Sequence, residues 1–176
     1  MKDCSDLSEF IANRERLAQE LRHMNALVKK YKKQTPTVTP IWDLSESSIA
    51  HNNICTETIE SGLILFIAPF ADVWSGIYEP SIYDRETLWK KIHDNTKIAR
   101  IIEHWNNNQK LSPIFLVKHG RKELGLVADG KHRLTVARYM DCDYMPFMVP
   151  SSDSGWVSVA IPSATKYNNS LITSPP

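Results

Sequence analysis

Apolar residues recur every three or four positions through the first part of the chain and predict one long helix over residues 5–33. The repeated positions form a seam of Leu7, Phe10, Arg14, Leu17, Leu21, Met24, Val28 and Tyr31. This heptad spacing occurs both in coiled coils and in helices that cover a core. We expect the helix to lie on the domain's own core, because four heptads are the lower limit for a coiled coil. The alternative is a partner helix that makes a homodimer.

Further apolar runs alternate with turn residues and predict the elements of one domain. Strands are expected at 63–67, 114–117, 124–128 and 144–149, with a short strand at 38–42 and an edge strand at 156–161. Ile98, Ile101, Ile102 and Trp105 share one face of a further helix. We therefore divide the chain into an N-terminal helix (1–34), a domain (35–162) and a mobile C-terminal tail (163–176) rich in Ser, Thr, Asn and Pro.

Charge and composition narrow the classes of partner. The formal net charge of the 176 residues is only +1, so contact with DNA would need a local basic patch. Lys29 to Lys33 forms one such group, although lysines also suit a helix C-terminus. The longest apolar run, 63–68, is too short to span a membrane, and the polar start at Met1 argues against a signal peptide. Three widely spaced cysteines fit reduced thiols in a cytoplasm.

The stretch 125–138 carries the strongest chemical pattern. An apolar strand ends in Asp129-Gly130, and Lys131, His132 and Arg133 then open a helical pattern. Backbone N–H groups are unpaired in a first helical turn, so this arrangement predicts an anion site. The alternative is that Asp129 is only an N-cap, Gly130 only a turn glycine, and the three basic residues only solvated.

This motif resembles that of the ParB/sulfiredoxin-like superfamily. The run Asp-Gly-Lys-His-Arg-Leu follows a hydrophobic strand, and 110–117 is similar to the superfamily's Leu-x-Pro strand entry. The resemblance covers residues 78–149. It implies an α+β fold with a small mixed sheet, flanking helices and, here, the long N-terminal helix. It also implies binding of nucleotide phosphates at the turn, or a task on DNA.

Departures from the superfamily's patterns narrow the expected activity. Lys131 stands where sulfiredoxins have their catalytic cysteine, which argues against sulfinic-acid repair. Within the superfamily the chain most resembles plasmid fertility-inhibition factors of the Osa type. That resemblance implies an ATP-hydrolysing and DNA-cleaving phosphohydrolase (an ATPase and DNase) that suppresses DNA transfer by conjugation. It also implies a location in the cytoplasm of a bacterial host.

Residue roles follow from the motif and the resemblance together. Gly130, Lys131, His132 and Arg133 are expected to bind nucleotide, with Arg85 from the loop at 71–87. Asp129, His132 and Glu79 are the expected catalytic groups. Asp129, Glu79 and Asp84 are the expected ligands of Mg²⁺ or another divalent cation, with ATP as substrate or ligand. The alternatives are that Asp84 caps a helix and that Glu79 is a surface charge.

Other functions stay open at this point. The chain could be a non-catalytic inhibitor that binds a type IV secretion or conjugation component. A small-molecule kinase of the same superfamily is a further alternative. A DNA-partition adaptor is less favoured, because no helix-turn-helix follows the motif.

Overall fold

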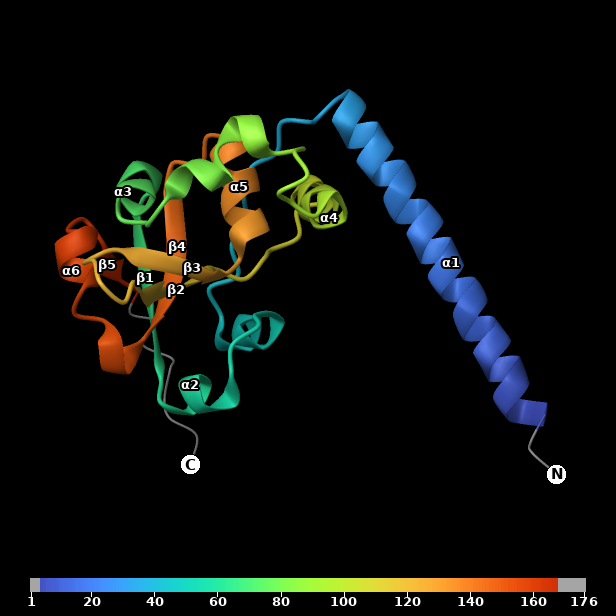
Figure 1. Cartoon of the computed structure of the whole chain (residues 1–176), viewed down its shortest axis with the longest axis horizontal. Coiled ribbons are helices and arrows are strands. Elements are labelled where there is room, and N and C mark those ends of the chain that lie inside the picture. The colour runs from blue at the N-terminus through green and yellow to red at the C-terminus, as the bar shows by residue number, and fades with distance from the viewer. Residues whose placement is uncertain (1–3, 168–176) are drawn as a thin grey trace.

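One mixed sheet of five strands forms the centre of the fold in the computed structural model, which describes residues 4–167 (Figure 1). The strands are β1 (Leu63–Pro69), β2 (Ile114–Lys118), β3 (Gly125–Asp129), β4 (Tyr144–Pro150) and β5 (Thr165–Lys166). Their order across the sheet is β3-β2-β4-β1-β5. The β2–β4 pair is parallel and the other pairs are antiparallel. The fold is therefore α+β, and the superfamily's specific fold stays an expectation.

Helices surround this sheet and complete its core. They are α1 (Cys4–Lys33), α2 (Thr56–Glu60), α3 (Phe70–Ser75), α4 (Asn95–Asn106), α5 (Lys131–Tyr139) and α6 (Val157–Ala160). Short 3₁₀ helices occur at Glu46–His51, Pro80–Tyr83, Arg85–Thr87 and Ser151–Asp153. In the central strands β1 and β4, the rings of Phe66 and Phe147 stack with centroids 5.6 Å apart. Burial of such side chains is the main stabilising contribution to the domain.

The helices α4 and α5 pack against each other and position the motif. Asp94 caps α4 by accepting hydrogen bonds from the backbone N–H groups of Thr96 and Lys97. The buried Trp105 anchors α4, because its Nε1 donates to the backbone oxygen of Ile41 at 3.0 Å. The predicted helix near residues 95–105 and the predicted strand–turn–helix motif are both confirmed.

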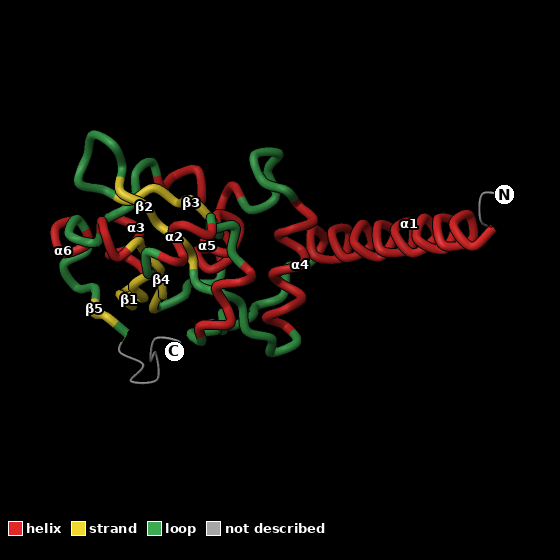
Figure 2. Tube along the Cα trace, turned by 90° about the horizontal axis from the view of Figure 1, so that it is seen from below, coloured by secondary structure: helices red, strands yellow, loops and turns green. Residues whose placement is uncertain are grey.

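Only the last third of α1 packs on the domain. Leu27 and Tyr31 are buried, and the Tyr31 hydroxyl donates to Glu103 of α4. Phe10 and Leu21 are exposed, and α1 extends well beyond the rest of the molecule (Figures 1 and 2). The expectation that the whole seam packs on the core is therefore wrong for its N-terminal part. None of the described helices is long and apolar enough to cross a membrane.

The C-terminal elements differ from the sequence prediction. Residues 157–160 form α6 rather than a strand, because Trp156, Val157 and Ile161 are buried with the spacing of a helix face. The expected strand at 38–42 is reduced to a single bridge between Trp42 and Leu111. The expected tail begins inside the fold, since β5 pairs with β1. The rest of the tail, 168–176, lies outside the described residues.

Candidate functional site

The motif forms a tight turn between β3 and α5. Gly130 is the N-cap of α5 and has a φ of 86°, in the left-handed region. A Cβ at this position would lie 2.8 Å from Cγ2 of the buried Ile114, so only glycine fits. No side chain caps α5. The alternative in which Asp129 is an N-cap is therefore wrong, and the backbone N–H groups of the first turn remain for an anion.

A pocket of about 720 Å³ lies in front of this turn. Most of its ionisable lining is basic, and these side chains are Lys97, Arg100, His104, Lys110, Lys131, His132 and Arg133. The acids in the lining are Asp43 and Asp129, and Ile101 and Leu111 are apolar. We call this the cationic pocket. Its size lies within the range of small-molecule sites.

Helix α4 supplies one wall of the cationic pocket. Lys97, Arg100 and His104 have the spacing i, i+3 and i+7 and so share one face of α4. The buried Ile98 and Ile102 lie on the neighbouring face and fix the orientation of the helix. This wall was not predicted from the sequence. Its only signal was the periodic spacing of the three polar residues, which also suits a solvent-exposed helix face.

Arg133 is bound within the protein rather than directed at solvent. Its side chain is only 12% exposed, and its Nη2 lies 2.9 Å from Asp129 Oδ2. The same Nη2 donates to the amide oxygen of the buried Asn52. Burial lowers the pKa of Arg133, and the neighbouring Asp129 opposes that shift. Arg133 therefore clamps the motif turn, a role that the sequence did not indicate.

His132 is also held by the protein. Its Nε2 accepts a hydrogen bond from the backbone N–H of Asp94 at 3.1 Å, so a neutral ring carries its proton on Nδ1. Burial lowers the pKa of His132, and the nearby His93 and Lys97 lower it further. The ring of His132 lies 5.7 Å from that of His93. While the Asp94 contact lasts, neither ring nitrogen of His132 is available as a general base, because Nδ1 carries the proton and the Nε2 lone pair accepts from Asp94.

We expect this histidine pair to make the protein less stable in acid. Burial lowers the pKa of both His93 and His132 below 6.5, so the unfolded chain binds these protons more readily. The contribution of the two neutral histidines to the free energy of unfolding is complete above about pH 6.5. It is lost as the pH drops toward and through their folded-state pKa values. Urea denaturation between about pH 8 and pH 5 should show this loss. In His132→Gln the loss should be smaller, and an unchanged pH profile would contradict the assignment.

His104 differs from His132 in which ring nitrogen contacts the backbone. Its Nδ1 lies 2.7 Å from the backbone oxygen of Arg100 and must donate to it. The neutral ring therefore carries its lone pair on Nε2. Because His104 lines the cationic pocket, this nitrogen is a candidate acceptor or base that sequence reasoning did not select.

Glu79, Asp84 and Arg85 do not line the cationic pocket. Arg85 pairs with Asp141 and its Nε donates to the backbone oxygen of Arg138, both at the C-terminal end of α5. A cation is favourable there, because a helix C-terminus is negative. The structure thus separates Arg85 from the nucleotide-binding residues with which the sequence interpretation grouped it.

The two acids of this segment have local roles. Asp84 caps the 3₁₀ helix at Arg85–Thr87 and lies 3.4 Å from Arg138 Nε. Glu79 is exposed and has a φ of 50° before Pro80. They are therefore not brought together with Asp129. Among the side chains that the structure describes, no three of His, Cys, Asp or Glu are grouped to hold a metal ion.

Comparisons with known proteins add no further guide to this site. No protein-family model, curated protein or solved structure matches the chain. Any function must therefore be argued from the cationic pocket and from the sequence motif.

Proposed function

We propose that the chain binds a phosphorylated small molecule, a nucleotide in the first place, in the cationic pocket. The observation that carries this proposal is the convergence of two basic surfaces. Lys97 and Arg100 from α4 face the uncapped first turn of α5, where Lys131 begins the helix. Backbone N–H groups and charged side chains together are the donors that phosphate groups require.

The form of the pocket favours a nucleotide over a single inorganic anion. Its volume of about 720 Å³ exceeds what one phosphate group fills. Ile101 and Leu111 add apolar lining beside the basic groups, which suits a base or sugar next to phosphates. Arg133 contributes indirectly in this account, because its contacts to Asp129 and Asn52 keep the turn in shape.

Calorimetric titration with ATP and with adenosine tests this proposal. We expect ATP to bind at one site per chain and adenosine to bind at least about tenfold more weakly, since the phosphates supply the charged contacts. Titrations with and without Mg²⁺ show whether the metal contributes to binding. Equal affinity for ATP and adenosine, or binding of neither, would contradict the proposal.

Hydrolysis of ATP and DNA, as in a fertility-inhibition factor, is the second candidate function. His104 favours this function, because its Nε2 lone pair could serve as a base. His104 and Asp129 both line the cationic pocket. His104 is a better candidate base than His132, because Asp94 holds the corresponding nitrogen of His132. Asp129 could act through Mg²⁺ or by orienting a base, but its Oδ2 accepts from Arg133. That contact favours a binding role without chemistry.

Measurement of phosphate release from ATP distinguishes an enzyme from a non-catalytic inhibitor. In the enzyme, His104→Gln should lower ATP hydrolysis by at least about tenfold, the low end for a general base, with little change in ATP affinity. His23→Gln, on the exposed part of α1, is the matched control and should keep full activity. If the wild type binds ATP and releases no phosphate with Mg²⁺, the chain is a binding protein, and the inhibitor of a conjugation or secretion component becomes the better account.

A further inference from the structure

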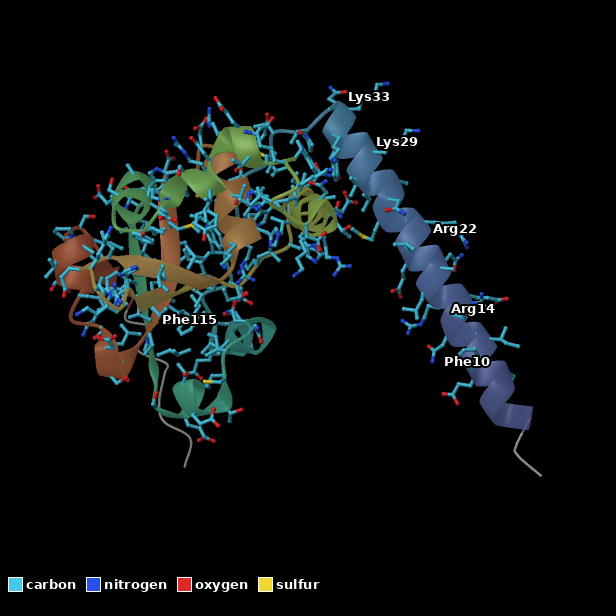
Figure 3. The ribbon with its side chains drawn as sticks, viewed as in Figure 1. Phe10, Arg14, Arg22, Lys29, Lys33 and Phe115 are labelled. Atoms are coloured by element: carbon cyan, nitrogen blue, oxygen red, sulfur yellow. The ribbon has the colours of Figure 1, made fainter. Side chains whose placement is uncertain are left out.

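The exposed part of α1 carries a row of large apolar side chains. Phe10, Ile11, Leu17 and Leu21 are 64%, 48%, 57% and 62% exposed. Figure 3 shows Phe10 and Arg14 on the segment of α1 that projects away from the sheet. Single exposed apolar residues are ordinary, but a row of them along one helix, interrupted only by Arg14, indicates a surface that is covered by a partner.

This row continues an interface that is already formed inside the chain. Met24, Val28 and Tyr31 occupy the later positions of the same seam, and they pack on the domain beside α4. The earlier seam positions keep the strict spacing of three and four residues. A strict seven-residue repeat is the pattern that fits a second helix, since two helices that supercoil keep such a seam in contact.

We propose that the exposed part of α1 pairs with the same segment of a second copy of this chain, in antiparallel orientation. Phe10 of one copy then lies opposite Leu21 of the other. Arg14 decides the orientation, because a parallel pair in register would bring the two Arg14 side chains together in the seam. In the antiparallel pair Arg14 faces Leu17 of the second copy instead, with its charged end free to reach solvent.

The length of α1 fits this register. With Phe10 opposite Leu21, position 24 of one helix lies opposite position 7 of the other. Because α1 begins at Cys4, the second copy's helix ends opposite Leu27, within one turn of Met24, where the domain starts to cover the seam, and before Tyr31. The antiparallel pair thus covers the exposed seam without displacing the contacts of Tyr31. A parallel partner would instead run into the part of the seam that the domain already covers.

The flanking charges are compatible with this arrangement. Glu20 borders the seam and, in the antiparallel pair, lies beside Asn13 of the second copy, next to Arg14. In its own chain Glu20 pairs with Arg16 at 3.0 Å, an exposed contact that contributes little by itself. Glu20 can therefore contribute to neutralising Arg14 across the pair.

Sedimentation of the full chain tests the pairing. We expect the wild type to reach a dimer of two 20.1 kDa chains between about 1 and 100 μM, the range expected for an interface of modest area. Leu21→Lys should be a folded monomer, because Leu21 is exposed within the single chain. Gln19→Lys, which adds the same charge away from the seam, should stay dimeric. A monomeric wild type, or a Leu21→Lys variant that remains a dimer, would overturn the proposal.

Disulfide trapping tests the orientation. In a background with Cys4, Cys55 and Cys142 changed to Ser, an equimolar mixture of Phe10→Cys and Leu21→Cys chains should form mixed disulfides under mild oxidation. Leu21→Cys alone should not, since the two Leu21 positions are eleven residues, about 16 Å, apart along the antiparallel pair. Efficient self-crosslinking of Leu21→Cys without mixed disulfides between the two variants would refute the antiparallel pair.

Discussion

Arg133→Ala lowers the free energy of unfolding by about 3 kcal/mol, the low end for removing one partner of a buried ion pair. The variant leaves the carboxylate of Asp129 without its partner in a site where that side chain is only 27% exposed. It also removes the donor to Asn52, whose own Nδ2 is already buried without a partner. Urea denaturation at pH 7 measures the loss.

Two comparisons separate this clamp from a general effect of removing charge. Lys131→Ala, two residues earlier and exposed, should change the free energy of unfolding by no more than about 0.5 kcal/mol. Adding Asp129→Ala to Arg133→Ala should cost little more, because the orphaned carboxylate is then gone. If Arg133→Ala were as stable as the wild type, Arg133 would not hold the turn, and a direct role in ligand binding would be the better account.

Lys97→Glu combined with Arg100→Glu lowers the affinity for ATP by at least about 100-fold. Each lost contact between a cation and a phosphate is worth about 1.5–3 kcal/mol, and 1.4 kcal/mol is a factor of ten. The reversed charges then repel the phosphates as well. Both residues are exposed, so the variant should keep the stability of the wild type. Calorimetric titration at constant ionic strength measures the affinity.

The matched control makes the same change of net charge far from the cationic pocket. Arg22→Glu combined with Lys29→Glu alters exposed residues on α1, which Figure 3 shows on the projecting helix. Its ATP affinity should stay within about threefold of wild type at physiological salt, because distant charges are screened. Equal losses in the two double variants would mean that ATP responds only to the overall charge, and the assignment of the α4 wall would be wrong.

The strands and the motif could be predicted because their signals are local. A run such as 144–149 is apolar at nearly every position, as a strand covered on both faces requires; the strand is confirmed, and its residues 145–149 are buried. The prediction of a strand at 156–161 is wrong. Over so short a length, its apolar residues fit both the two-residue period of a strand and the 3.6-residue period of a helix. Packing of Trp156 and Ile161 decides for a helix there. For α1, the spacing of apolar residues predicts the seam. It does not show which part of that seam packs on the chain's own domain and which part stays exposed.

Only one of the two sides of the cationic pocket could be predicted from the sequence. The turn at Gly130 was correctly placed, because strand, turn and helix are adjacent in the sequence. The wall from α4 was not, since it meets the turn only after Ile98 and Ile102 fix the helix against the core. Arg85 was grouped with the turn by resemblance, whereas its segment packs at the far end of α5.

We propose above all that the first turn of α5 and the facing side of α4 bind a phosphorylated ligand. Two-dimensional amide NMR of the wild type, titrated with ATP and separately with adenosine, tests it most directly. We expect saturable shifts of the backbone amides of Lys131, His132 and Lys97 with ATP, much smaller shifts with adenosine, and unchanged amides along the exposed part of α1. Shifts that avoid the start of α5, or that are the same for both ligands, would contradict it.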